Sequence, residues 1–220
     1  MKKVVLLAFI SVLCSCKMKE TAAVDGVNYF FEKPQPIEGR ELTKIPNKFQ
    51  GKFMSQDSIC LIIVDNCIYK SYFLKSKIQK SALDSIKTKF KNLNNKIVLK
   101  DFDKVYDFRI LNDSVELSTE IKDTIFFFSK NQTAKRFDGQ LILNLKDAVF
   151  WKVKIISIQK NILKIKQCFD LSDLKILDSI TKKKSKSIDS TGYLIQASRK
   201  EFKTIIRCKK LGYETNYQKF

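Results

Sequence analysis

Hydrophobic and polar residues alternate in short runs after Gly51, and turn residues separate these runs at intervals of about ten positions. Such alternation indicates half-buried antiparallel strands, because successive side chains of a strand point to opposite faces of the sheet. The clearest example is a hairpin of residues 59–64 and 67–74 around the turn pair Asp65-Asn66. Further strands are predicted over residues 96–102, 105–111, 115–121, 124–128, 140–145, 150–156 and 162–168.

The last three of these strands form a predicted meander. Leu141, Leu143 and Leu145 alternate with polar neighbours, and the strand at 150–156 alternates in the same way. We therefore expect one buried face and one solvated face along this part of the sheet.

Three segments depart from the alternation and predict short helices over residues 81–93, 172–184 and 199–211. The first and third begin with the capping-box patterns Ser81-x-x-Asp84 and Ser198-x-x-Glu201. Gly212 follows the third as a stop signal. The chain is therefore predicted to be α+β, with a mainly antiparallel sheet (a meander or barrel-like) and about three short helices.

The N-terminus has a different pattern. Two lysines precede a ten-residue apolar run that ends at Leu13-Cys14-Ser15-Cys16. A helix of ten residues rises about 15 Å, half of a bilayer's hydrocarbon core of roughly 30 Å, so this run is typical of a signal peptide rather than a membrane span. Leu13 at −3 and Ser15 at −1 resemble the lipobox of bacterial lipoproteins, Leu-x-(Gly/Ala/Ser)-Cys. The resemblance implies cleavage between Ser15 and Cys16 and lipid attachment to Cys16.

Residues 16–46 are predicted to be the lipidated N-terminus and a flexible tether, because all three prolines of the chain (Pro34, Pro36 and Pro46) fall there. Residues 1–15 are the predicted signal peptide. Residues 47–220 are then one β-rich globular domain, a size typical of a single core.

The charge is strongly basic. Removal of the signal peptide takes away Lys2 and Lys3 and leaves a formal charge of +17. The lysines are spread along the chain, and the only dense run is Lys182-Lys183-Lys184 with Lys186, which we interpret as a solvated helix end. Lysine outnumbers arginine 37 to 5, which argues against a nucleic-acid partner, since base readout favours arginine. We expect the lysines mainly to provide solubility.

Four cysteines remain beyond the lipobox: Cys60, Cys67, Cys168 and Cys208. In the predicted hairpin Cys60 lies four residues from the position opposite Cys67, which separates the two by about 13 Å and argues against a bridge between them. The other thiols are equally compatible with disulfides and with buried free thiols.

No catalytic or metal-binding signature is present. The chain has no histidine, which excludes Ser-His and Cys-His nucleophilic pairs and His-containing metal sites. Ser172-x-x-Lys175 has a β-lactamase-like spacing without its companion motifs, so helix capping by Ser172 is preferred. Asp101-x-Asp103 begins like a calcium loop but lacks the later ligands. We therefore predict no enzyme activity, no metal and no cofactor.

The overall layout is similar to that of a group of small uncharacterised lipoproteins of diderm bacteria. The resemblance covers most of the chain and implies no activity for any residue. It is carried by the lipobox, the Pro-rich spacer ending Ile45-Pro46-x-x-Phe49-x-Gly51-Lys52, the meander residues Leu143-Asn144 and Trp151-Lys152-Val153, and the closing Ser198-x-x-Glu201-Phe202-Lys203.

These features predict a lipoprotein of the bacterial cell envelope, anchored to a membrane through Cys16, with the outer membrane favoured and the body in the periplasm or at the cell surface. A structural or interaction role is the first expectation. The alternative is a lipocalin-like binder of an apolar small molecule, in which Trp151, Phe126, Phe127 and Phe128 would line the barrel wall. An envelope enzyme that uses Asp or Glu is the second alternative.

Overall fold

The computed structural model describes residues 26–81, 90–93, 96–99, 104–168 and 170–220. The predicted signal peptide, Ser15 and Cys16 lie outside these residues, as do Asp101 and Asp103. The strands are β1 (Asn28–Phe31), β2 (Gly51–Met54), β3 (Cys60–Ile63), β4 (Cys67–Gln79), β5 (Phe90–Leu93), β6 (Lys96–Leu99), β7 (Lys104–Ile110), β8 (Ser114–Phe127), β9 (Gln132–Phe137), β10 (Gln140–Asp147), β11 (Phe150–Gln159), β12 (Ile162–Gln167), β13 (Lys186–Ser187), β14 (Gly192–Ile195) and β15 (Tyr213–Lys219).

The predicted fold class is confirmed: the protein is β-rich, and its strands join in one mostly antiparallel sheet. The strand order is β13-β14-β1-β11-β12-β15-β2-β3-β4-β8-β7-β6-β5, and β10 and β9 continue from the other edge of β11. Only β1 and β14 run parallel in this sheet, within the described strands. The predicted meander corresponds to β10, β11 and β12.

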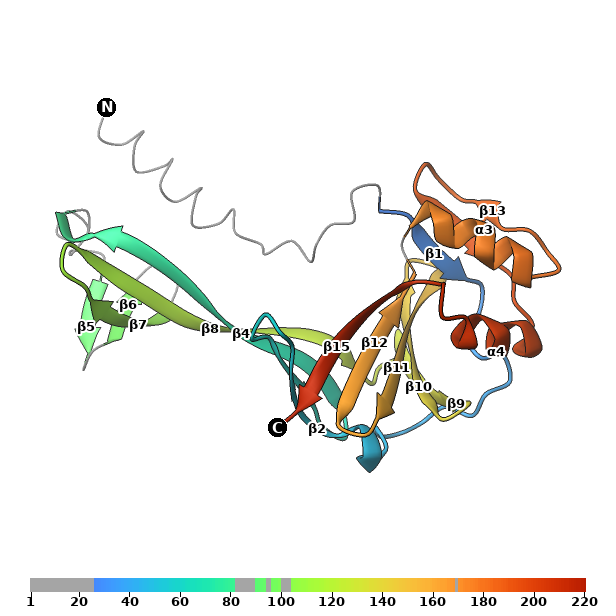
Figure 1. The fold of residues 1–220 in the computed structure, drawn as a ribbon, viewed down its shortest axis with the longest axis horizontal. Coiled ribbons are helices and arrows are strands. Elements are labelled where there is room, and N and C mark those ends of the chain that lie inside the picture. The colour runs from blue at the N-terminus through green and yellow to red at the C-terminus, as the bar shows by residue number, and fades with distance from the viewer. Residues whose placement is uncertain (1–25, 82–89, 94–95, 100–103, 169) are drawn as a thin grey trace.

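The sheet curls around a first hydrophobic core, and the seam between β9 and the β3–β4 hairpin is closed by the chain before β2 (Figure 1). Glu41 bridges to Lys135, the Leu42 amide donates to the Ala134 carbonyl at 2.8 Å, and the Ile45 amide donates to the Asp65 carbonyl at 2.7 Å. The short 3-10 helix η1 (Asn47–Phe49) then places Phe49 in this core.

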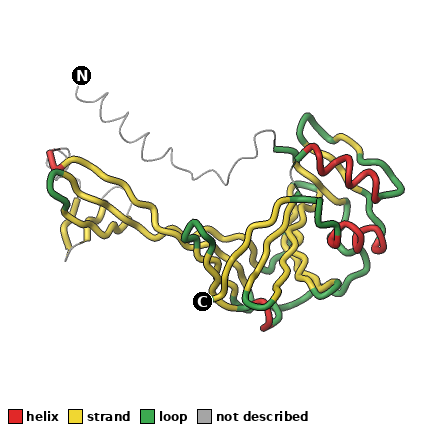
Figure 2. The backbone as a smooth tube through the Cα atoms, viewed as in Figure 1, coloured by secondary structure: helices red, strands yellow, loops and turns green. Residues whose placement is uncertain are grey.

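A second core lies on the other side of β10 and β11, where the helices α3 (Leu171–Ile180) and α4 (Arg199–Arg207) pack with β1 and β14 (Figure 2). Leu141 and Leu143 of β10 belong to the first core, whereas Ile142 belongs to the second. The expectation of one solvated face is therefore wrong for β10, because each of its two faces packs against a hydrophobic core.

Residues 27–46 also differ from the sequence prediction. The Pro-rich stretch is predicted to be a tether, but the structure places Val27, Tyr29 and Phe31 in the second core and Ile45 in the first. The aromatic run Tyr29-Phe30-Phe31 is the sequence signal for docking on the domain, but its pairing with β14 depends on residues far away in the chain and is not visible in local composition.

The helices begin and end differently from their predicted bounds. Helix α4 has the predicted Ser198–Glu201 capping box but ends at Arg207, well before Gly212. Helix α3 is capped by Asp170 instead of Ser172 and ends at Ile180. For the predicted helix at 81–93, residues 82–89 lie outside the described residues, and its last part is wrong because Phe90–Leu93 form strand β5.

Candidate functional site

A long ribbon of two strands, β4 and β8, projects from the curled sheet and is the most distinctive feature of the surface (Figure 1). The thirteen residues of β4 pair with β8 from Cys67↔Phe127 to Gln79↔Ser114. Strand β3 accompanies β4 only as far as Ser71, and β7 joins β8 only near the tip. The eight residues of β4 beyond Ser71 correspond to about 27 Å of projecting strand.

One face of the ribbon is apolar and covered near the tip. Val115 and Leu117 are buried there and pack with Ile78, Tyr106 and Phe108. This small core explains why the end of the ribbon keeps its β-structure away from the main cores.

The opposite face is solvated and charged, with one large aromatic side chain among the charges. Phe73 is 61 % exposed and lies directly opposite Glu120 in the register. The Ser71 hydroxyl donates to Glu120 at 2.5 Å, and this hydrogen bond holds the pKa of the Glu120 carboxyl below its usual range. Lys75 and Lys77 continue this face toward the tip. An exposed aromatic ring within a charged surface has the composition of a protein-binding hot spot.

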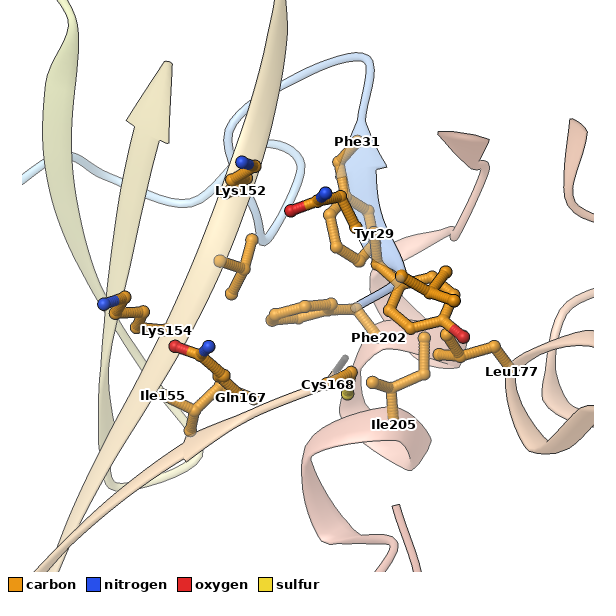
Figure 3. Close-up of a pocket in the computed structure, with 13 residues that line it drawn as sticks. Tyr29, Phe31, Lys152, Lys154, Ile155, Gln167, Cys168, Leu177, Phe202 and Ile205 are labelled. Carbon is orange, nitrogen blue, oxygen red and sulfur yellow. The ribbon is translucent and has the colours of Figure 1, made fainter. Parts of the chain in front are cut away.

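A cavity of about 260 Å³ lies where β1 and β12 diverge from β11, above α3 and α4 (Figure 3). On this edge of β11, β1 pairs only at Phe31↔Trp151 and β12 begins to pair at Ile155. The stretch of β11 between these two points therefore has no described strand beside it, which leaves room for the cavity. Apolar side chains form most of its wall: Val27, Tyr29, Phe31, Val153, Ile155, Leu177, Phe202 and Ile205.

The polar groups at this cavity do not form a reactive set. The Tyr29 hydroxyl donates to the Asp170 carbonyl at 2.6 Å, and burial raises the pKa of Tyr29. Burial and the nearby Asp173 carboxylate raise the pKa of Cys168 to about 12, so this thiol is protonated at neutral pH and is a poor nucleophile. Lys152 pairs with Asp147 at 2.8 Å, and Figure 3 shows the Lys154 amine turned away from the ring of Tyr29. The arrangement therefore offers space for an apolar group.

Of the four aromatic residues predicted to line a barrel wall, the structure brings Phe126 and Phe128 together and places Phe127 and Trp151 elsewhere. Phe126 and Phe128 pack edge-to-face at 5.1 Å and belong to the filled first core, whereas Phe127 is half-exposed. Trp151 lies at the end of β11 beside Phe31. The described interior of the curled sheet thus holds side chains where a lipocalin ligand would lie.

The cysteines and the carboxylates at the start of α3 have structural roles. All four cysteines of the described residues are free thiols, and Cys60 pairs in register with Ser71 instead of facing Cys67. The carboxylates of Asp170 and Asp173 form the capping box at the start of α3. Asp173 also accepts a hydrogen bond from the Gly212 amide at 2.7 Å. Across the described ranges, no group of three potential metal ligands is found.

Two buried polar residues were not predicted from the sequence, and both hold the chain between β1 and β2. Asn144 accepts from the Gln35 amide at 2.6 Å and donates to the Gln35 carbonyl at 2.9 Å. Lys135 donates to the carbonyls of Pro34 and Pro36, each at 3.0 Å. In the sequence, a buried polar residue of a strand occupies the same alternating position as a solvated one, so the pattern does not distinguish the two.

Comparisons with protein-family models, with curated proteins and with solved structures each give no match. None of the helices in the described ranges combines the length and apolar character that crossing a membrane requires.

Proposed function

We propose that this protein is a lipid-anchored protein of the bacterial cell envelope that binds another envelope protein through the ribbon β4/β8. The anchor in this proposal is Cys16, as the lipobox resemblance implies. The observation that carries the binding role is the solvated face of the ribbon, with Phe73 at its centre.

Several features of that face support a protein partner. An exposed phenyl ring gains free energy when a partner removes it from water, by about 25 cal/mol for each Å² buried. Glu120, Lys75 and Lys77 surround it with charges of both signs, which favour recognition of a patterned protein surface over attraction to a uniform polyanion. The ribbon also carries this face away from both hydrophobic cores, so a partner can approach it without a clash with the curled sheet.

Photo-crosslinking in cells tests the proposal. A photoreactive amino acid replaces Phe73 in one strain and Tyr213 in another; Tyr213 is a matched control because it is an aromatic residue of similar exposure, 58 %, on β15. We expect a discrete adduct with one envelope protein from position 73 and no such adduct from position 213.

Binding measurements with that purified partner then decide the role of the ring. Phe73→Ala should weaken the complex about 30-fold, the effect of a hot-spot residue worth about 2 kcal/mol, while Tyr213→Ala should leave the affinity unchanged. Equal adducts from both positions, or an affinity indifferent to Phe73→Ala, would contradict the proposed function.

The cavity beneath β1 favours a second candidate function, the binding of a small apolar molecule. Its wall is mostly apolar, and its volume of about 260 Å³ lies just below the range typical of small-molecule sites. Native mass spectrometry of the purified protein should then show a bound molecule that is lost when Ile205→Trp fills the cavity.

A further inference from the structure

The ribbon has an open edge along β4. Strand β3 pairs with β4 only as far as Cys60↔Ser71, and β8 lies on the opposite side of β4 throughout. From Tyr72 to Gln79 one side of the β4 backbone therefore faces away from the sheet formed by the described strands. An open edge of this length is a template for the addition of another strand.

The hydrogen-bond pattern identifies the backbone groups on this edge. The Val64 amide donates to the Cys67 carbonyl at 3.0 Å, and hydrogen-bonded pairs recur at every second residue of an antiparallel ladder. Odd-numbered residues of β4 thus direct their N–H and C=O groups toward the β3 side, and even-numbered residues direct theirs toward β8. The Lys80 amide, which donates to the Asp113 carbonyl at 3.1 Å, agrees with this assignment beyond the far end of the strand.

Past the end of β3, the odd-numbered residues Phe73, Lys75 and Lys77 carry the backbone groups of the open edge. Their side chains lie on the solvated face of the ribbon, and all three are exposed. Among the described residues, no strand pairs with them on the β3 side and no turn or loop hydrogen bond of the backbone involves them. The same three residues therefore offer both backbone partners and side chains to an added strand.

The side chains along the edge define the strand that fits it. Between Tyr72 and Gln79 the charged residues of β4 are Lys75 and Lys77, and this stretch contains no acid. On the other face Leu74 and Ile78 are half-buried, and Ile78 packs on the small core at the tip. Opposite charges on neighbouring strands stabilise a sheet, as do paired apolar side chains. A strand with acidic residues on one face and apolar residues on the other is therefore complementary to this edge.

The acids of the solvated face lie one strand further in, on β8. Glu120 is 3.5 Å from the Lys122 amine. Glu116 is opposite Lys77 in the register and opposite Arg109 on its other side. A strand added beside β4 would be two strand spacings, about 10 Å, from β8. The edge is therefore basic although the whole face carries charges of both signs.

The same lysines argue against a second copy of the chain at this edge. Antiparallel pairing of two β4 edges would bring Lys75 and Lys77 of one copy close to those of the other, and like charges directly opposite destabilise a sheet. Lysines on an edge strand are a common protection against such self-association. The occupant is therefore a segment of different sequence.

We propose that the partner binds the ribbon by strand addition, with an extended segment of alternating acidic and apolar residues that pairs with β4 at Phe73, Lys75 and Lys77. This inference rests on the proposed function, because it specifies how the ribbon holds its partner. Backbone hydrogen bonds along the edge supply affinity, and the alternating side chains select the segment.

Amide hydrogen exchange of the full chain, followed by NMR, tests the geometry and the pairing. In the free protein the amides of Phe73, Lys75 and Lys77 should exchange quickly, whereas those of Leu74 and Ser76, which face β8, should exchange slowly. A synthetic peptide as long as the open edge, with alternating glutamate and valine, should slow the exchange of the three odd-numbered amides several-fold. A lysine–valine peptide of equal length is the control and should leave them unchanged.

Two variants separate the backbone from the charge. Lys75→Pro removes one outward N–H without taking a hydrogen bond from the β4–β8 ladder, and proline is tolerated in edge strands where the N–H faces solvent. It should abolish the protection given by the glutamate–valine peptide. Lys75→Gln keeps the N–H and removes the charge, so it should only weaken that protection. Slow exchange of the Leu74 amide in both variants shows that the ribbon is intact.

Unchanged exchange of the odd-numbered amides with the glutamate–valine peptide would overturn strand addition, and so would equal protection by both peptides. Protection that needs no peptide and grows with protein concentration would overturn it in favour of self-pairing. The proposed function is judged separately: an adduct from position 73 and an affinity that falls with Phe73→Ala would sustain it even where strand addition fails.

Discussion

Replacement of Asn144 by Ala tests whether the segment between β1 and β2 is an integral part of the fold. Asn144 is fully buried, and its side-chain amide forms two hydrogen bonds with the backbone of Gln35, to the amide at 2.6 Å and to the carbonyl at 2.9 Å. Asn144→Ala leaves both backbone groups without these partners. Each buried unsatisfied group costs about 1–3 kcal/mol, so the free energy of unfolding should fall by about 2–6 kcal/mol.

Urea and thermal unfolding of the full chain measure this loss. For a domain of this size, each kcal/mol lowers the melting temperature by about 2–4 °C, which predicts a decrease of roughly 4–24 °C. Asn161→Ala is the matched control, because Asn161 lies exposed in the β11–β12 turn and its replacement should change stability by less than about 0.5 kcal/mol.

Asn144→Asp tests the two hydrogen bonds separately, because it keeps an acceptor for the Gln35 amide and removes the amide donor to the Gln35 carbonyl. A carboxylate still accepts from the Gln35 amide but repels the Gln35 carbonyl, whereas a protonated carboxyl can donate to that carbonyl. Burial and this contact should raise the folded-state pKa of the new carboxyl above its unfolded value of about 3.9. The folded protein then binds more protons than the unfolded chain between the two pKa values, so the variant should lose stability as pH rises through that window. An Asn144→Ala loss no larger than that of Asn161→Ala would refute the reasoning.

Three further predictions concern the buried lysine, the anchor and the two kinds of phenylalanine. Burial lowers the pKa of Lys135 from its usual 10.5. The unfolded chain therefore holds more protons between the lowered value and 10.5, and wild-type stability should rise with pH in that window relative to Lys135→Met, as urea unfolding at several pH values can show. Cys16→Ala should release the protein from the membrane fraction and block signal removal, and a variant that still sediments with membranes and shortens normally would contradict the lipoprotein assignment. Phe202→Ala should cost about 3–5 kcal/mol of unfolding free energy because Phe202 is fully buried, whereas Phe73→Ala should cost less than about 0.5 kcal/mol, and calorimetry would expose comparable losses as a contradiction.

Local pattern was sufficient to predict the strands whose partners are neighbours in the sequence. The turn pair Asp65-Asn66 joins β3 and β4 as expected, with the Val64 amide donating to the Cys67 carbonyl at 3.0 Å. The β10–β12 meander is also confirmed. In both cases the alternation and the turn residues lie within about 30 residues, so the sequence contains the whole unit.

Long-range pairing was not predictable in the same way. Strand β1 lies parallel to β14, more than 160 residues away, and β15 joins β12 to β2 across the sheet. The alternation of β10 was misread because Asn144 is as buried as its apolar neighbours. A polar residue that satisfies a distant backbone has the same sequence pattern as one that faces water.

The candidate site was missed for a related reason. The alternation at 115–121 and 124–128 predicts two short strands, whereas β8 is continuous through Lys122 and Asp123. Lys122 and Asp123 interrupt the apolar pattern although they pair in register with Ser71 and Lys70, near the base of the ribbon.

The length of the ribbon is itself an argument for a role that requires reach. Two-stranded ribbons are marginally stable in water, because they bury little surface. Here the base is held by β3 and the first core, and the tip by Val115 and Leu117, while the stretch around Tyr72 and Leu74 is two-stranded among the described residues. A chain selected only for stability would turn back after Ser71, where β3 stops contributing. A continuous ribbon beyond that point costs stability and presents Phe73 to solvent, and the binding partner proposed for that face would offset both.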